Sequence, residues 1–175
     1  MYLWRLDHLP LPESPAGYTI RPLIPGEERA RWELLDKAGD LGVWDAKRAE
    51  EEFTASSGRV WKDSTHFAVS EDRVVGTACV QLHAERDDMP ELGWVAVARA
   101  YRERGLGRIL CLRIVEFIRR RGFQHCFVQT RSHRIGAVKL FRDLGFQPCG
   151  DSSDPSLSAF FNTLPHRPRV ETQGV

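Results

Sequence analysis

Within the stretch ELGWVAVARAYRERGLGRIL, residues 91–110, the chain changes from a strand pattern to a helix pattern. Residues 91–98 form an apolar run of β-forming side chains, which predicts a buried strand. From Gly105 the apolar side chains recur at helical spacing, and Gly122 ends that pattern. The apolar face comprises Leu106, Ile109, Leu110, Ile114, Phe117 and Ile118. A strand, a glycine-containing loop and a helix therefore follow one another directly.

The loop between them, R-x-x-G-x-G from Arg102 to Gly107, has the composition of a phosphate site. A helix N-terminus offers unpaired backbone N–H groups and a partial positive charge to an anion. Gly105 and Gly107 allow close approach of the backbone to a ligand. Three arginines add positive charge there: Arg102, Arg104 and Arg108. The same residues also fit a tight turn with solvated arginines, so both interpretations stay open at this point.

Two other phosphate loops are excluded by spacing. The dinucleotide fingerprint G-x-G-x-x-G requires a third glycine where the chain has Leu110. The nucleoside-triphosphate loop requires Gly-Lys-Ser/Thr, and here Arg108 and Ile109 follow the last glycine.

Length and composition indicate a single globular domain of 175 residues with a net charge of +1. This balance does not recruit nucleic acid or an anionic membrane, although eight arginines between residues 99 and 121 favour a local anionic ligand. Four separate cysteines in apolar surroundings are typical of reduced core thiols: Cys79, Cys111, Cys126 and Cys149. Without an apolar run of 18 residues or a signal pattern, we expect a cytoplasmic protein. The six histidines show no metal-ligand spacing, so we expect no metal.

The rest of the chain predicts an α/β fold with a central, twisted, mixed β-sheet and helices on both of its faces. Residues 1–17 are read as an extended N-terminal segment, 18–164 as the single domain and 165–175 as a loose tail. Strands are predicted at 18–22, 66–82 as a hairpin, 124–130, 146–149 and 157–164. Helices are predicted at 26–39, 45–58 and 135–144. The strand-helix-strand unit over residues 91–130 predicts a parallel, right-handed crossover.

Two segments together resemble the GNAT family of N-acetyltransferases. The first is GWVAVARAYRERGLGRIL, residues 93–110, and the second is RIGAVKLFRDLGF, residues 134–146. The second matches the family signature at Ala137, Leu140, Gly145 and Phe146. This resemblance covers residues 91–149 and implies a sheet splayed beside strand 91–98. It also implies acetyl transfer from acetyl-CoA to a primary amine by direct attack, without a covalent enzyme intermediate.

The resemblance also implies residue roles. The backbone N–H of Val95 would contact the thioester oxygen, and Ala96 and Val97 would hold the pantetheine arm. The second signature would lie beside the cofactor with Arg134, Ala137 and Phe141. The pyrophosphate would rest on the loop made of Arg102, Glu103, Arg104, Gly105, Leu106, Gly107 and Arg108.

Glu91 is the candidate general base. It stands eleven residues before Arg102, the position of the catalytic glutamate in the histone-acetyltransferase branch of the family. Regular strand alternation would put Glu91, Gly93, Val95 and Val97 on one side, where apolar neighbours raise the pKa of the carboxyl group. The alternative is a solvent-exposed glutamate at the start of a strand.

Two positions depart from the family signature. Arg134 replaces the common asparagine and is similar to the mycothiol-synthase-like branch, although a first-turn helix residue without a cofactor contact is also consistent. Phe141 replaces the tyrosine that often protonates the departing thiolate. A thiol with a pKa near ~8.5 can leave with little assistance, so activity is compatible with phenylalanine.

The acceptor and partners are less constrained. A small-molecule or peptide amine is expected to bind in a pocket built by residues 1–65 and 150–164, with Glu85, Asp87 and Asp88 as candidate attractants for a cation. A homodimer through residues 157–164 remains open. Two other functions also remain open: a catalytically weak or inactive acyl-CoA-binding sensor, and an RNA-binding module around Arg119, Arg120 and Arg121. The expected partners include no nucleic acid and no membrane.

Overall fold

The computed structural model describes residues 2–5, 12–53, 58–61, 63–84 and 89–148. Seven strands form one sheet in the order β2-β3-β4-β5-β6-β1-β7. The strands are β1 Tyr2–Arg5, β2 Thr19–Pro22, β3 His66–Ser70, β4 Arg73–Gln81, β5 Glu91–Val97, β6 His125–Val128 and β7 Gln147–Pro148. The helices are α1 Glu28–Ala38, α2 Ala46–Phe53, α3 Leu106–Arg120 and α4 Ile135–Asp143, with a short 3-10 helix η1 at Arg99–Tyr101.

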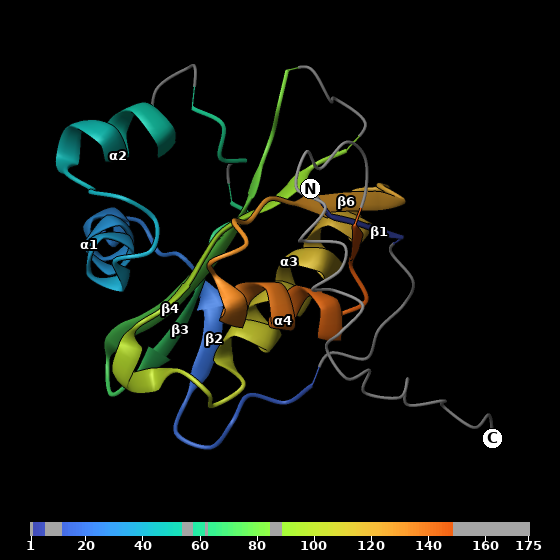
Figure 1. The fold of residues 1–175 in the computed structure, drawn as a ribbon. Helices are drawn as coiled ribbons and strands as arrows, with labels where there is room; N and C mark the ends of the chain where they lie inside the picture. The colour runs from blue at the N-terminus through green and yellow to red at the C-terminus, as the bar shows by residue number, and fades with distance from the viewer. Residues whose placement is uncertain (1, 6–11, 54–57, 62, 85–88, 149–175) are drawn as a thin grey trace.

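The sheet is mixed and carries helices on both faces, as the sequence predicted. Figure 1 shows α1 and α2 on one side of the sheet and α3 and α4 on the other. The predicted hairpin is β3 and β4, which pair antiparallel around Glu71 and Asp72. Both turn residues have positive φ, 46° and 60°, as a tight two-residue hairpin turn requires. The parallel pairing predicted for the strand-helix-strand unit is also confirmed, because β5 and β6 pair in parallel.

The larger core lies between the sheet and the pair α3 and α4. Helix α3 contributes a continuous buried face that includes Leu106, Leu110, Ile114 and Ile118, which are at most 1 % exposed. The core on the opposite face is smaller and contains Leu35, Ala38, Trp44 and Ala96. The apolar side chains that recur at helical spacing in the sequence are therefore the ones that α3 buries against the sheet.

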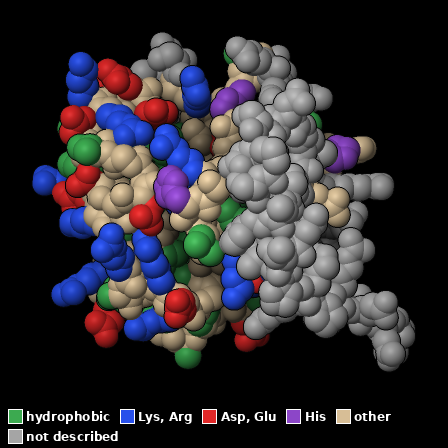
Figure 2. Space-filling model, in the orientation of Figure 1, with side chains coloured by type: hydrophobic (Ala, Val, Ile, Leu, Met, Phe, Trp, Pro, Cys, Tyr) green, Lys and Arg blue, Asp and Glu red, His purple; other side chains and the backbone are tan. Residues whose placement is uncertain are grey.

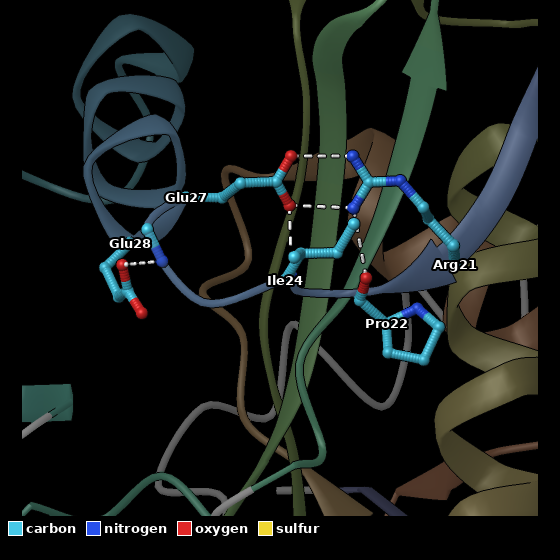
Figure 3. A network of polar contacts seen from close by, with 6 residues as sticks. Arg21, Pro22, Ile24, Glu27 and Glu28 are labelled. Atoms are coloured by element: carbon cyan, nitrogen blue, oxygen red, sulfur yellow. Dashed lines mark hydrogen bonds and ion pairs between the residues drawn. The ribbon is translucent and has the colours of Figure 1, made fainter.

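A bidentate ion pair connects the start of helix α1 to the neighbouring strand β2 (Figure 3). The guanidinium of Arg21 donates two hydrogen bonds of 2.7 Å to the two carboxylate oxygens of Glu27. Glu27 also accepts the backbone N–H of Ile24 at 3.1 Å, so its carboxylate closes the turn that leads into the helix. The hydrogen bond from Arg21 is the main reason why the pKa of Glu27 lies below its ordinary value.

The sequence analysis assigned no strand to residues 1–17, and this was incomplete. Tyr2–Arg5 forms β1, which pairs antiparallel with β6 on one side and with β7 on the other. Its partner strand lies more than a hundred residues away in the sequence, and such distant pairing leaves no local signal. The predicted strand at 157–164, the tail at 165–175, and Glu85, Asp87, Asp88 and Cys149 lie outside the described residues. Asp45 does cap α2, accepting the N–H of Arg48 at 2.8 Å.

Three of the cysteines expected in the core are buried and form no disulfide: Cys79, Cys111 and Cys126. Within the described residues no helix is long and apolar enough to cross a membrane. Figure 2 shows acidic and basic side chains interspersed over the face that carries α1 and α2. The arginines considered for RNA are engaged locally, because Arg119 and Arg120 both form ion pairs with Glu116.

Candidate active site between strands β5 and β6

Strand β5 contains a bulge in its middle. Trp94 has a φ of 47°, and the register with β4 shifts between Thr77 and Cys79. The extra residue reverses which face the following side chains occupy. Val95 and Val97 therefore pack with Leu92 into the larger core, and Ala96 packs into the smaller one. The prediction that Glu91, Gly93, Val95 and Val97 share one side was wrong, because it assumed unbroken alternation.

Strands β5 and β6 pair only at the first residue of β5 and diverge after it. Their parallel register contains a single pair, Glu91 with Phe127. A cavity of about 70 Å³ lies where the two strands separate. Four predicted site residues line it: Glu91, Val95, Arg134 and Phe141. The other lining residues are Leu41, Gln81, Leu92, Gly93, Trp94, Val128 and Gln129. The divergence of the two strands that the family resemblance implies is therefore present, and a cavity lies within it.

Glu91 is buried at one end of this cavity, with 7 % of its surface exposed. Its Oε1 accepts the backbone N–H of Gln129 at 3.3 Å, a donor beyond the single β5–β6 pair. Its Oε2 lies 2.6 Å from the Nε2 atom of His83. Burial raises the pKa of Glu91, and the hydrogen bond from His83 opposes that rise. The alternative of a solvent-exposed glutamate is therefore wrong.

The loop before α3 contains two residues with left-handed backbone conformations. Glu103 and Gly105 adopt positive φ angles of 63° and 81°. The N-terminus of α3 has no side-chain cap and no acidic residue in its first turn. The backbone N–H groups at this end therefore retain capacity to bind an anion.

Gly105 and Gly107 require glycine for different structural reasons. At Gly105 an added Cβ would meet nothing within 4 Å, so its positive φ is the constraint. At Gly107 an added Cβ would lie 3.3 Å from Cδ2 of Leu140 on α4. Gly107 therefore lets helix α3 approach α4 closely, in addition to leaving the backbone open. Leu106, counted among the cofactor residues from the sequence, has its side chain in the core with 1 % exposed.

The second motif borders the cavity through α4. Arg134 precedes the first turn of α4 and lines the cavity. Burial lowers the pKa of the Arg134 guanidinium; the charge of Asp40 opposes this and that of Arg102 adds to it. Phe141 is buried against Phe146, with ring centroids 5.8 Å apart. Ala137 packs on the larger core, and the structure gives it no place in the cavity lining.

Comparison with known proteins assigns the family. Residues 29–146 match the model of the "Acetyltransferase (GNAT) family". The chain belongs to the GNAT family of acetyltransferases. A mycothiol acetyltransferase from Thermobispora bispora is 30% identical over 163 residues, covering 82% of this chain and 53% of the relative. This GNAT chain spans about half the length of the mycothiol acetyltransferases that it matches.

Solved structures of GNAT proteins share the fold. A GCN5-related N-acetyltransferase from Sphaerobacter thermophilus is 29% identical, with a TM-score of 0.65 covering 83% of this chain and 46% of that one. Diaminobutyrate acetyltransferase EctA from Paenibacillus lautus, in complex with L-2,4-diaminobutyric acid and coenzyme A, is 16% identical. Its TM-score is 0.61, with 73% and 74% of the two chains covered.

The arginines of the GNAT loop are engaged within the protein. Arg102 donates to the carbonyl oxygens of Val97 at 3.0 Å and Ala38 at 3.2 Å, and to Asp40 at 3.1 Å. Arg104 donates to the hydroxyl of Tyr18 and to the carbonyl oxygen of Ala100. Arg108 donates to the carbonyl oxygen of Asp143. In this conformation the three side chains fix the loop against α1, against Tyr18 just before β2, and against α4. Phosphate contact and solvated arginines were the two interpretations expected from the sequence, and the structure adds this internal role.

Three polar residues at the cavity escaped the sequence analysis: Gln81, His83 and Gln129. Gln81 is the register partner of Glu91 across β4 and β5, so the hairpin pattern combined with the strand at 91–98 held a usable signal. His83 is two residues further along the same chain segment. No sequence pattern indicated Gln129, because its position at the cavity depends on the divergence of β6 from β5. Within the described residues, no group of three or more metal-binding side chains occurs.

Proposed function

We propose that this chain transfers an acetyl group from acetyl-CoA to a primary amine by direct attack. The observation that carries the proposal is the hollow splay between β5 and β6, which has the buried carboxylate of Glu91 at its end. The uncapped N-terminus of α3 follows β5 in the chain and supplies backbone donors suited to the cofactor pyrophosphate. Family membership supports acetyl transfer, and the acceptor amine is part of the proposal.

In this reaction the chain contributes hydrogen bonds, charge and shape. The backbone N–H of Val95 stabilises the thioester oxygen as negative charge builds on it. The carboxylate of Glu91 promotes removal of the amine proton, and burial raises its pKa. Arg134 is a half-buried cation that lines the cavity and favours the phosphate-bearing cofactor. Ala96 and Val97 hold the pantetheine arm through their backbone.

Phe141 shapes the exit of the thiol. It lines the cavity where many family members have a tyrosine, and it carries no proton to donate. The proposed reaction therefore releases the thiol without a side-chain acid on α4. A thiol with a pKa near ~8.5 is a competent leaving group at neutral pH without such help.

The test is thermal unfolding of the whole chain with acetyl-CoA, ATP, NAD or no ligand. At a hundredfold over Kd, acetyl-CoA should add roughly 2.7 kcal/mol, which raises Tm by about 5–10 °C for a domain of this size. We expect Gly107→Glu to abolish this shift, because a carboxylate would occupy the anion site. Lys47→Gln on the exposed side of α2 changes the net charge equally and should keep the shift. A shift with ATP or NAD alone, or an unaffected Gly107→Glu, would disprove the loop assignment.

A second candidate is an acyl-CoA-binding sensor, which Phe141 favours because the common acid is missing. It predicts the same thermal shift without turnover. Release of CoA from acetyl-CoA should therefore be followed with 2,4-diaminobutyrate, glucosamine and a tripeptide with a free N-terminal alanine. Amine-dependent release with any of them supports the transferase, whereas binding without release from the whole panel supports the sensor.

A further inference from the structure

We propose that His83 accepts the proton of the attacking amine and that Glu91 acts through it as a positioning residue. This inference rests on the proposed function and names the atom that removes the proton. Neither the family motifs nor the glycine loop includes His83. The pair combines a buried carboxylate with an imidazole that is 2.6 Å away and partly open to solvent.

The charge state of Glu91 sets the tautomer of the imidazole. With Glu91 ionised, its Oε2 accepts a hydrogen bond, and Nε2 of His83 carries the hydrogen that is donated. Nδ1 then presents a lone pair, and it has no hydrogen-bond partner among the described residues. The ring is also held in orientation by Phe127, with centroids 5.4 Å apart. Glu91 and Phe127 therefore aim the basic nitrogen of His83.

The two members of the pair differ in access. The side chain of Glu91 is 9% exposed, and its other oxygen already accepts the N–H of Gln129. The side chain of His83 is 20% exposed, so it is the more accessible member. An amine that approaches from solvent reaches the imidazole more readily than the carboxylate.

His83 is also placed near the reaction cavity. Gln81 lines the cavity and is the register partner of Glu91. The chain stays extended beyond Gln81, since Val60 bridges Gln81 and the N–H of Leu82 donates to the carbonyl of Arg59 at 2.7 Å. His83 follows Gln81 by two residues in the chain. Its hydrogen bond to Glu91, a residue that lines the cavity, connects the imidazole to the cavity wall.

The proton balance of the step is complete. The amine nitrogen forms a bond to the acetyl carbon, and its proton passes to Nδ1 of His83. The resulting imidazolium is stabilised by the carboxylate of Glu91 through the Nε2–H hydrogen bond. The carbon–sulfur bond breaks, and the CoA thiolate takes the proton from the imidazolium. The products are an amide and a thiol, and the imidazole returns neutral.

The charged groups around the pair set its pH response. Glu91 on β5 faces the imidazole directly. Arg59, in the segment that bridges β4, acts on Glu91 by its charge. We expect the pH profile of kcat/KM to depend on this pair and to change when the imidazole is removed in His83→Gln.

The experiment compares His83→Gln, Glu91→Gln and His66→Gln with the wild type, using the same three amines. His66 on β3 is the matched control, since its ring contacts the carbonyl of Ser64 and not Glu91. We expect His83→Gln to lower kcat/KM about 10²-fold or more, the usual range for a lost general base. The thermal shift with acetyl-CoA should stay unchanged. Imidazole added to His83→Gly should restore part of the rate, which a purely structural role would not produce.

The outcomes separate this inference from the proposed function. If the wild type releases no CoA with any amine, the transferase is wrong and the role of His83 is wrong with it. If His83→Gln keeps the wild-type rate and pH profile, only the role of His83 is overturned, and Glu91 acts directly. If Glu91→Gln abolishes the pH dependence while His83→Gln does not, the proton acceptor is Glu91.

Discussion

Gly93 lies so close to the side chain of Gln81 that no larger residue fits without rearrangement. A Cβ built on Gly93 would lie 2.1 Å from Oε1 of Gln81 and 2.6 Å from Cδ. We predict that Gly93→Ala lowers the free energy of unfolding by about 1–3 kcal/mol, because Gln81 must move away from the cavity wall. In a Gln81→Ala background the same change should cost at least about 0.5 kcal/mol less. Urea unfolding of the four variants measures this coupling, and strictly additive effects would contradict it.

Individual site residues were predictable from the sequence only where a motif or a fixed spacing identifies them. Glu91 was found from its spacing to Arg102, and Phe141 from its place in the second motif. The orientation of Val95 was not predictable, because the positive φ of Trp94 interrupts the alternation of β5. Bulges carry no composition signal when the residue is a tryptophan instead of a glycine.

Helix α3 carries its own pH-dependent stabilisation. Glu116 forms ion pairs of 2.8 Å with both Arg119 and Arg120, at helical spacings of three and four residues. The hydrogen bond from Arg119 is the main cause that lowers the pKa of Glu116 to about 2, against an ordinary value of 4.5. A carboxyl group whose pKa is lower in the folded state stabilises the protein above the unfolded pKa. This stabilisation is lost as pH falls from about 4.5 toward 2.

Accordingly, Glu116→Gln should reduce the free energy of unfolding by about 1 kcal/mol at pH 7, a modest value because both arginines are partly exposed. Denaturant unfolding from pH 7 down to pH ~2 should show the difference from wild type shrinking toward zero. Glu50→Gln on α2 is the control, since Glu50 forms no ion pair among the described residues. A difference that stays constant across this pH range would show that the ion pairs are not its source.

The helices and the hairpin could be predicted because their signals are local. The apolar spacing of α3, the Asp45 cap of α2 and the turn at Glu71 and Asp72 each lie within a few residues of the element they define. The internal bonds of the loop arginines were not predictable. They depend on partners as distant as Asp40 for Arg102 and Tyr18 for Arg104.

The order of strands across the whole sheet required more than the sequence. The parallel neighbours β5 and β6 followed from the crossover rule. The position between β6 and β7 was unassigned, and the structure fills it with the N-terminal strand β1. Four residues with distant partners on both sides give no pattern that distinguishes them from an extended leader. Strand β1 therefore joins β7 to the rest of the sheet.

The interior position of β1 gives a direct test of the whole sheet. Leu3 pairs with Phe127 on β6 and with Gln147 on β7. A proline at this position has no N–H to donate and disturbs an interior ladder, so Leu3→Pro should cost about 1–3 kcal/mol of unfolding free energy. Leu3→Val keeps the N–H and suits a strand, so it should unfold close to wild type. Hydrogen exchange should in addition accelerate in β6 of Leu3→Pro. Equal stability of Leu3→Pro and Leu3→Val would mean that the N-terminus does not belong to the sheet in solution.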